Sequence, residues 1–405
     1  MRYELAASPQ GRIPSHRGDA VLPGTSVNTV FINGKFAARR VTGVQRVALN
    51  LLRALDESLS GPDGLPATPP STPQAATRWV LLCPPGATPP ALRRIETCVV
   101  GSSSWPLHLW EQIVLPYAAR TGLLLNLAGS APMLAIRQVC LWHDAAVFDR
   151  PQAYTPAFSA WYRFAFRWLS GRAEQLLTVS AFSRGRLARQ LHLPEERIGI
   201  VPNGAEHLLA VPADVSVLRR LGLESVNYFL AVGSRNPNKN LELLLSAWNG
   251  VTATPMPRLV IVGSEDNLVF AGTVRAGDIR ASTVVDAGAI DDAELRALYE
   301  HASALVFPSL YEGFGLPPLE AMACGCPVLC SHAASLPEVC GDAALYFDPL
   351  STEQISAAMN RLLRDAELRA SLRERGYAQA RRFSWRLAAE RLLAQIDVGA
   401  ARVPV

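Results

Sequence analysis

The chain has 405 residues, of which 49% are hydrophobic and 18% are charged, and its formal net charge is +4. This length favours two domains over one, and the composition excludes a disordered protein. The small positive charge suits an anionic small ligand or an anionic membrane surface, but it does not predict a protein that binds nucleic acid.

The seven cysteines show neither a disulfide pattern nor a metal-binding pattern. An odd number in so long a chain favours a reducing compartment, so we expect a cytoplasmic protein. Four cysteines lie between Cys324 and Cys340, but their spacing lacks the paired C-x2-C of a zinc site. We interpret them as small buried apolar residues.

The N-terminal half predicts an α/β domain behind a polar leader. Residues 1–26 are rich in Pro, Ser, Gly and Arg and contain no continuous apolar core, so we expect a disordered leader and no signal peptide. Short apolar runs predict strands at 29–32, 79–83, 123–126 and 139–142. Apolar residues at helical spacing predict a helix at 44–55, with Gly43 at its start.

Two segments of this half raise the question of a membrane. Residues 115–136 are the most apolar, but Arg120, two glycines and two prolines interrupt them, so they do not predict a spanning helix. Residues 161–177 alternate aromatic side chains with arginines and predict a helix. Such a helix could contact a membrane surface, or it could pack within the domain with its arginines extended toward solvent.

From residue 226 onward, strands and helices alternate. Strands are predicted at 228–232, 259–262, 283–285, 304–307, 328–330 and 344–347, and helices at 241–248 and 293–302 among others. This alternation predicts a parallel sheet covered by helices. Ser384 is a suitable N-cap for a last helix that reaches residue 396.

The stretch from Pro308 to Phe347 is the most informative part of the chain. Its first loop contains Gly313 and Gly315, which allow a tight turn with exposed backbone amides, and Pro317 fits the first turn of the helix that follows. Backbone amides at the start of such a helix attract phosphate.

Two carboxylates, Glu312 and Glu320, stand at the two edges of this predicted anion site. A carboxylate repels phosphate, so each is better suited to accept hydrogen bonds from hydroxyl groups beside it. Phosphate flanked by hydroxyl groups describes a nucleotide sugar.

This stretch resembles the E-x7-E signature of the retaining GT-B glycosyltransferases of family 4, and the resemblance continues through 335–339 to 347–349. It implies that Glu312 faces the donor sugar and that Glu320 holds the ribose hydroxyls. The backbone amides implied to meet the sugar and the diphosphate are those of Gly313, Phe314, Gly315 and Leu316.

The same resemblance implies a GT-B fold, an α/β architecture in which two Rossmann-like parallel-sheet domains face each other across a cleft. Residues 27–210 would form the acceptor domain and residues 211–380 the nucleotide-sugar donor domain. Residues 381–405 would supply a helix that crosses back to the first domain.

The resemblance also assigns roles outside the E-x7-E stretch. His143 follows a predicted strand directly, where ligands bind in open α/β sheets. A lone His-Asp pair is usually structural, but the family has a histidine here against the donor sugar, and Asp144 is a candidate for orienting it. The loop around Gly43 would approach the diphosphate and the acceptor, although an ordinary strand-to-helix turn explains this glycine nearly as well.

Arg235 and Lys239 place two cations beside a helix N-terminus, where the helix dipole alone disfavours them. The family uses an arginine and a lysine here to hold the donor diphosphate. Lys239 matches the lysine position. In the family the arginine commonly follows the loop glycine directly. Here Ser234 follows Gly233, and Arg235 comes one residue later.

These assignments predict retaining transfer of a hexose from a nucleotide sugar to a glycan or a lipid-linked saccharide. No D-x-D motif stands at a strand end, so we expect cationic side chains, and no metal or cofactor, to stabilise the leaving diphosphate.

Likeness to bacterial mannosyltransferases of surface-polysaccharide assembly suggests GDP-mannose as the donor. UDP-glucose and dTDP-rhamnose would fit the same phosphate contacts. Peripheral contact with the inner face of the cytoplasmic membrane is a further expectation.

Three alternatives stand beside this prediction. A nicotinamide dehydrogenase would also be α/β, but no G-x-G-x-x-G follows a strand with an acidic residue at the right distance. A non-catalytic GT-B subunit should have lost one of the donor-site groups, all of which are present. A GT-B phosphorylase or epimerase would need inorganic phosphate, or would convert a nucleotide sugar with no acceptor.

Overall fold

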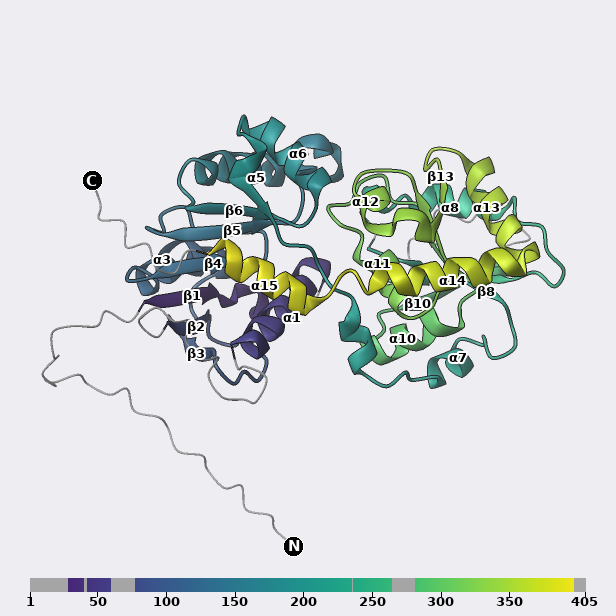
Figure 1. Cartoon of the computed structure of the whole chain (residues 1–405), viewed down its shortest axis with the longest axis horizontal. Helices are drawn as coiled ribbons and strands as arrows, with labels where there is room; N and C mark the ends of the chain where they lie inside the picture. Colours follow the sequence, from purple (N-terminus) through teal and green to yellow (C-terminus); the bar gives the residue numbers. More distant parts are fainter. Residues whose placement is uncertain (1–27, 40–41, 60–76, 235, 264–280, 397–405) are drawn as a thin grey trace, which may run out of the picture.

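The computed structural model describes residues 28–39, 42–59, 77–234, 236–263 and 281–396, which form two α/β domains that lie side by side (Figure 1). The predicted leader at residues 1–26 and the donor-site candidate Arg235 lie outside the described residues.

The N-terminal domain is built on a fully parallel seven-stranded sheet in the order β3-β2-β1-β4-β5-β6-β7. Its strands are β1 (Thr29–Asn33), β2 (Arg78–Cys83), β3 (Glu96–Val99), β4 (Leu123–Asn126), β5 (Gln138–Trp142), β6 (Gln175–Thr178) and β7 (Ile198–Ile200). Helix α1 (Gly43–Ser58) covers one face. The other face carries α2 (Leu107–Leu109), a π-helical turn (Trp110–Val114), α3 (Leu115–Ala118), α5 (Pro156–Ser170) and α6 (Ala181–Leu191).

The side chains of β1 point alternately to the two faces of the sheet, so this strand packs against helices on both faces. Val30 and Ile32 pack in the core with α1, whereas Phe31 packs with Trp110 and Leu115 on the opposite side. Because parallel strands are covered on both faces, they are apolar throughout, and this is why the inner strands are predictable from short apolar runs.

The C-terminal domain has a parallel six-stranded sheet in the order β10-β9-β8-β11-β12-β13. Its strands are β8 (Tyr228–Val232), β9 (Arg258–Val262), β10 (Val284–Gly288), β11 (Ala304–Phe307), β12 (Val328–Ser331) and β13 (Ala344–Phe347). Helices α8 (Leu241–Trp248) and α13 (Thr352–Arg364) share a core on one face. The other main helices are α10 (Asp292–His301), α11 (Leu316–Ala323), α12 (Leu336–Cys340) and α14 (Ala366–Ala380).

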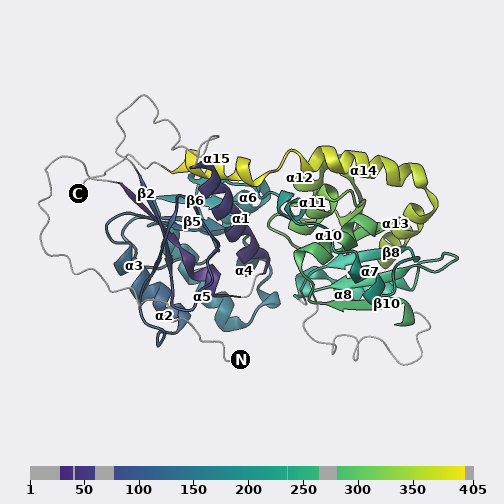
Figure 2. The same ribbon diagram turned by 90° about the horizontal axis from the view of Figure 1, so that it is seen from below.

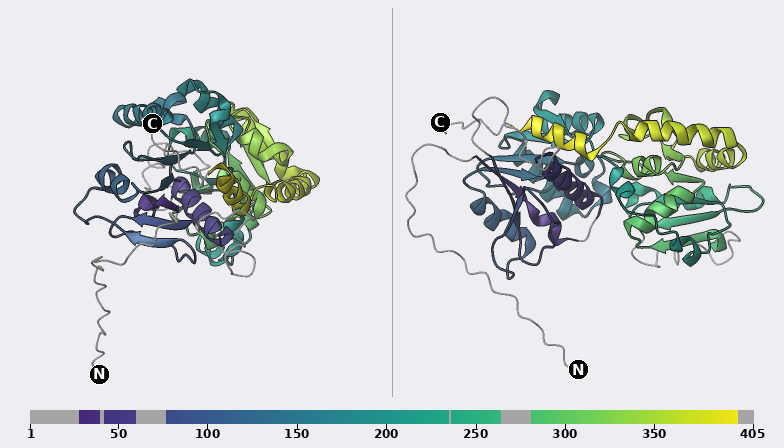
Figure 3. Two further views of the ribbon diagram at one scale, coloured as in Figure 1. Left: turned by 60° about the vertical axis from the view of Figure 1, so that its left-hand side comes forward. Right: turned by 60° about the horizontal axis from the view of Figure 1, so that its bottom comes forward.

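The C-terminal helix α15 (Trp385–Gln395) leaves this domain and packs on α1 of the N-terminal domain, as the yellow helix in Figure 3 shows. Ser384 caps it by accepting a hydrogen bond from the Leu387 amide at 3.1 Å, as predicted. Within the described residues, no helix is long and apolar enough to cross a membrane.

Two sequence predictions need correction. The helix predicted at 161–177 is wrong beyond Ser170, because Gly171 ends α5 and residues 175–178 form strand β6. The sequence from Trp110 onward also predicts a helix, but the helical segment begins earlier, at Leu107. Strand β3 is absent from the prediction because its residues are all exposed, so it lacks an apolar run.

The cysteines are free, and the four between 324 and 340 are buried as predicted.

The strand order of each sheet defines where a ligand can bind. The chain moves outward from β1 to β3 and then returns to β4 on the other side of β1, and β8 to β11 repeat this arrangement. Ligands of open α/β sheets bind at such a reversal point, beyond the carboxyl ends of the strands. The loops after β1, β4, β8 and β11 are therefore the first places to look for a site.

Candidate active site

The loop between β11 and α11 has the shape that the sequence predicts for an anion site. Gly315 is the N-cap of α11 with a φ of 99°, a left-handed conformation that favours glycine. Pro317 lies in the first turn, and no side chain caps the helix. The start of α11 therefore leaves backbone N–H groups without a side-chain acceptor, which is the arrangement that attracts phosphate.

Gly313 brings this loop against the N-terminal domain. A Cβ atom on Gly313 would lie 1.9 Å from the backbone oxygen of His143 and 2.9 Å from the Asp144 Cβ. The carbonyl of Gly313 accepts hydrogen bonds from Ser180 Oγ at 2.6 Å and from Ser183 Oγ at 3.0 Å. A side chain at position 313 would force the two domains apart.

Further hydrogen bonds join the domains around this contact. The Glu338 carboxylate accepts from the amides of Ala181 and Phe182 at 2.7 and 2.9 Å, at the N-terminus of α6. Tyr311 donates to Asp149 Oδ2 at 2.8 Å. The site is thus built from both domains.

Lys239 and Glu312, which the sequence places on the diphosphate and on the sugar, form an ion pair with each other at 2.6 Å. Lys239 ends the short turn after β8, and its stem lies against Gly233. The Glu312 backbone is held by Ser335, whose hydroxyl donates to the Glu312 carbonyl at 3.0 Å. The two side chains are therefore already neighbours at the facing ends of β8 and β11.

His143 extends from the end of β5 beside the Gly313 loop. Its Nε2 donates to the Leu127 carbonyl at 3.0 Å, so Nδ1 is the unprotonated nitrogen of a neutral ring. Burial lowers the pKa of His143 to about 4. The ring is neutral at pH 7, and it can orient a substrate by hydrogen bonding but carries no charge.

Asp144 follows His143 but makes a different contact. Its Oδ1 accepts from the Ala146 amide at 2.7 Å, and burial raises the pKa of Asp144. The ring of His143 is oriented by the Leu127 carbonyl, and the structure shows no hydrogen bond from it to Asp144.

Glu320 lies deeper than the other predicted site residues and is only 3% exposed. Tyr299 donates to its Oε2 at 3.2 Å, and His207 Nε2 lies 3.1 Å from its Oε1. Trp385 of α15 donates to His207 Nδ1 at 3.2 Å, so Nε2 carries the proton of the neutral ring and points at Glu320.

Burial by itself would raise the pKa of Glu320. The hydrogen bond from His207, the charge of the nearby Arg46 and the hydrogen bond from Tyr299 outweigh burial, so the pKa is lowered. Arg46 belongs to α1, and its Nη1 also lies 2.6 Å from Asp292 Oδ1 at the start of α10. Groups from both domains and from the crossing helix therefore converge on this carboxylate.

Gly43 is the first residue of α1, and a Cβ atom built there has no neighbour within 4 Å. The preceding Thr42 does not cap the helix, because its hydroxyl contacts the Gln45 side chain. A second helix thus begins at the cleft with backbone amides that no side chain caps.

A cavity of about 280 Å³ opens in the N-terminal domain next to His143 and Asp144. Its lining combines aromatic and polar side chains. The aromatic residues are Phe36, Tyr154, Phe158, Tyr162 and Phe166, and the polar ones include Asn33, Lys35, Arg39, Gln45 and Ser130.

A buried ion pair lies beside this cavity, because Lys35 lines it and pairs with Glu111. Lys35 Nζ lies 2.5 Å from Glu111 Oε2, and the other carboxylate oxygen accepts from Ser130 Oγ at 2.6 Å and Asn33 Nδ2 at 3.2 Å. Burial lowers the pKa of Lys35. The sequence analysis misses this pair because its partners are 76 residues apart; the one signal is a glutamate inside an apolar segment.

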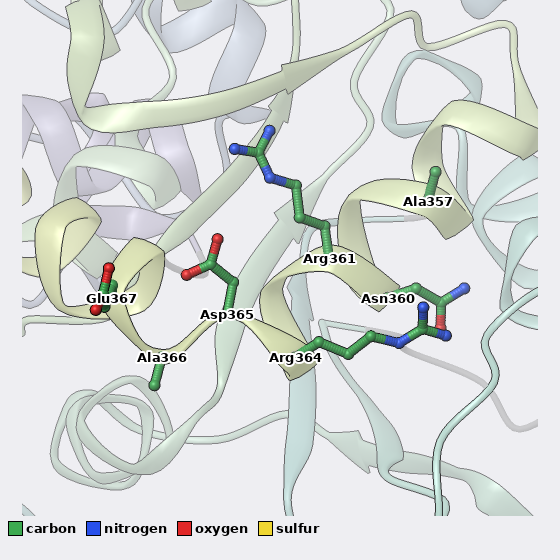
Figure 4. A pocket seen from close by; sticks show the side chains of 7 residues that line it. All are labelled: Ala357, Asn360, Arg361, Arg364, Asp365, Ala366 and Glu367. Carbon is green, nitrogen blue, oxygen red and sulfur yellow. The ribbon is translucent and has the colours of Figure 1, made fainter.

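Figure 4 shows a hollow between α13 and α14 that does not belong to this site. Three of its polar groups already have structural partners. Asn360 binds the Thr252 amide, Arg364 donates to the Thr252 hydroxyl, and Asp365 caps α14.

In the part of the chain that the structure describes, no three His, Cys, Asp or Glu side chains are grouped as a metal site.

Two parallel-sheet domains with a cation, carboxylates and uncapped helix starts where their strands end are the architecture of a GT-B glycosyltransferase. Comparison with protein families agrees: residues 41–207 match the model "Glycosyltransferase Family 4", and residues 219–379 match "Glycosyl transferases group 1". The chain belongs to the GT-B glycosyltransferases of family 4.

Among curated proteins, the chain is 35% identical to O-antigen chain mannosyltransferase B of Escherichia coli over 257 residues, which cover 62% of this chain and 67% of that protein. It is 29% identical over 261 residues to the serotype-specific mannosyltransferase WbdA of E. coli. That match covers 62% of this chain and only 32% of the longer relative.

Solved structures share the fold at low sequence identity. The sucrose-phosphate synthase of Thermosynechococcus elongatus has a TM-score of 0.69 at 19% identity, over 91% of this chain and 98% of that one. WaaG, described as a glycosyltransferase involved in lipopolysaccharide biosynthesis, has a TM-score of 0.67 at 17% identity, over 92% and 100% of the two chains.

Proposed function

We propose that this glycosyltransferase transfers mannose from GDP-mannose, with retention of configuration, to a glycan or a lipid-linked saccharide during surface-polysaccharide assembly. The observation that carries the transfer chemistry is the Lys239–Glu312 pair beside the uncapped start of α11. The choice of mannose rests on the names of the E. coli relatives, an O-antigen chain mannosyltransferase and a serotype-specific mannosyltransferase.

Departure of the nucleoside diphosphate builds negative charge on phosphate, and Lys239 and the amides of residues 313–316 are placed to stabilise it. When the diphosphate binds Lys239, Glu312 loses its ion-pair partner and can accept hydrogen bonds from sugar hydroxyls. Loss of one such pre-positioned donor typically costs about 3–4 kcal/mol of transition-state stabilisation. Glu312 is not assigned as a covalent nucleophile; the acceptor would attack the same face with help from the leaving phosphate.

The acceptor would occupy the cavity beside His143. Its aromatic side chains can lie against the apolar face of a sugar ring, while Asn33, Lys35 and Ser130 can bind its hydroxyl groups. Glu320 would bind the ribose of the donor through lone pairs that His207 and Tyr299 leave free, since each carboxylate oxygen can accept two hydrogen bonds.

A panel of nucleotide sugars tests the proposal. GDP-mannose, UDP-glucose and dTDP-rhamnose are each added to purified full-length protein, and thermal stabilisation and donor hydrolysis are measured. We expect the largest response with GDP-mannose, and a larger response with another sugar nucleotide would reject the mannose assignment. Transfer that requires inorganic phosphate would indicate a phosphorylase, and conversion of the donor into a different sugar nucleotide, without hydrolysis or an acceptor, would indicate an epimerase.

A further inference from the structure

The helical segment 107–118 exposes an apolar stripe. Leu109, Ile113 and Tyr117 are spaced four residues apart and are all exposed, Tyr117 to 70%. The opposite side of the same segment is buried, with Trp110 and Leu115 in the core against β1 and β4. Large apolar side chains thus cover both sides of this helix, although only one side packs against the protein.

The loop between β4 and β5 extends this stripe. Gln112 holds the loop with two hydrogen bonds, donating to the Ala131 carbonyl at 3.2 Å and accepting from the Met133 amide at 3.0 Å. The same loop exposes Leu134 and Ile136, each to 73%.

Helix α5 adjoins the loop on its other side, because Trp168 Nε1 donates to the Met133 carbonyl at 3.0 Å. This helix exposes Phe158, Trp161 and Phe164. Figure 2 shows α2, α3 and α5 on one side of the N-terminal sheet, with α15 on the other. We call the surface formed by Leu109, Ile113, Tyr117, Leu134, Ile136 and Phe164 the apolar face.

The charges around the apolar face are basic. Between residues 102 and 173 the acidic residues are Glu111, Asp144 and Asp149. Glu111 is buried against Lys35, Asp144 binds a backbone amide in the site, and Asp149 is paired with Arg186.

The arginines of the same segment lie closer to the apolar face. Arg120 lies over the Tyr117 ring at 4.2 Å, and Arg172 lies over the Trp168 ring at 3.5 Å. Arg137 pairs with Glu174 just beyond the segment. Exposed apolar and aromatic side chains combined with arginines match the interface of an anionic lipid bilayer, where rings enter the headgroup region and cations meet lipid phosphates.

The cavity adjoins elements of this face. Phe158 of α5 lines the cavity and is itself exposed. Arg39, which also lines the cavity, lies 3.5 Å from His108 Nε2 on the segment 107–118. The lining of the cavity thus includes α5 and contacts the segment 107–118, two of the three elements that carry the apolar face.

We propose that the apolar face docks on an anionic phospholipid bilayer and sets the cavity mouth at the headgroup level, where a lipid-linked acceptor can enter. This inference rests on the proposed function for the identity of the acceptor, but membrane docking itself does not depend on the sugar donor.

Co-sedimentation of the full-length protein with vesicles tests the docking. We expect binding to phosphatidylcholine vesicles that contain phosphatidylglycerol, weaker binding to phosphatidylcholine alone, and weakening by salt. The double variant Ile113→Glu/Tyr117→Glu should bind the anionic vesicles at least about tenfold more weakly, because it places carboxylates against anionic headgroups. Leu350→Glu is the matched control, because Leu350 is as exposed as Ile136 but lies in the C-terminal domain, and it should bind like the wild type.

Three results would overturn the proposal: no wild-type binding to either vesicle, equal binding by wild type and double variant, or a wild-type dimer that the double variant converts to a monomer. Thermal unfolding of the double variant verifies that it is folded, and the milder Tyr117→Ser replaces it if it is not. Donor hydrolysis by the double variant should equal that of the wild type. If hydrolysis fails in the wild type while vesicle binding persists, the proposed function is wrong and the docking surface stands.

Discussion

Lys239 Nζ lies 2.6 Å from Glu312 Oε1, so the cation expected to bind the diphosphate and the carboxylate expected to face the sugar form an ion pair with each other. This pair keeps both charges in place at the ends of two neighbouring strands, β8 and β11, which hydrogen-bond to each other. An anionic donor must replace Glu312 as the partner of Lys239, and Glu312 is then free to bind the sugar.

Replacing Lys239 by alanine should reduce the rate of sugar transfer about a hundredfold or more, because a pre-positioned cation for the leaving diphosphate is lost. The fold should survive, since the side chain is partly exposed. Initial rates at saturating donor measure the effect, and Arg361→Ala, in the remote hollow of Figure 4, is the matched control for removal of a cation. Wild-type turnover by Lys239→Ala would contradict the assigned role.

Gly313→Ala should destabilise the protein and reduce activity, because the added methyl group would meet the His143 backbone oxygen at 1.9 Å. Overpacking of this kind costs roughly 1–3 kcal/mol. Gly43→Ala is the comparison for stability, since the space in front of Gly43 is open. Urea unfolding of both variants measures the difference, and equal stabilities would show that the two domains do not meet at Gly313 in solution.

Trp385→Phe keeps an aromatic side chain but removes the five-membered part of the indole, including the N–H group that binds His207. Loss of one such hydrogen bond costs about 1 kcal/mol, and a less firmly held His207 should leave Glu320 less well placed. We expect a higher KM for the donor with a smaller change in kcat, because Glu320 is proposed to bind ribose at some distance from the reacting bond. A fall in kcat alone would argue against this role, and Trp105→Phe, at an exposed tryptophan, is the control.

The buried ring of His143 predicts a pH dependence of stability. Its folded-state pKa of about 4 lies below the ordinary value of 6.5, so between these pH values the unfolded chain binds a proton that the folded chain does not. Stability should therefore fall as the pH drops from 6.5 toward 4, by roughly 3 kcal/mol from this group.

His143→Asn should flatten this part of the curve of unfolding free energy against pH, whereas His301→Asn, at an exposed histidine, should not. The rate of transfer at saturating donor should show no titration of His143 between pH 6 and 8. Curves of equal slope for the wild type and His143→Asn would mean that the ring is accessible to protons in the folded protein.

The sequence by itself predicts the inner strands other than β6, the two glycine loops and the starts of α1, α11 and α15, because these depend on neighbouring residues. A buried strand is a short apolar run, and Gly313, Gly315 and Pro317 set the geometry of their own loop. The E-x7-E spacing is equally local, so it identifies the family and names Glu312 and Glu320 before any contact is known.

Only the tertiary structure decides which distant groups meet. Lys35 meets Glu111 because β1 lies between β2 and β4 in its sheet, and His207 reaches Glu320 because α15 returns Trp385 to the junction of the domains. No sequence motif predicts such pairs. The number of residues between the two partners depends on the lengths of the intervening loops, whereas their distance in space depends on the order of the strands. The residues of the glycine loops are therefore predictable from local motifs, whereas the groups that hold them and the walls of the cavity beside His143 are not.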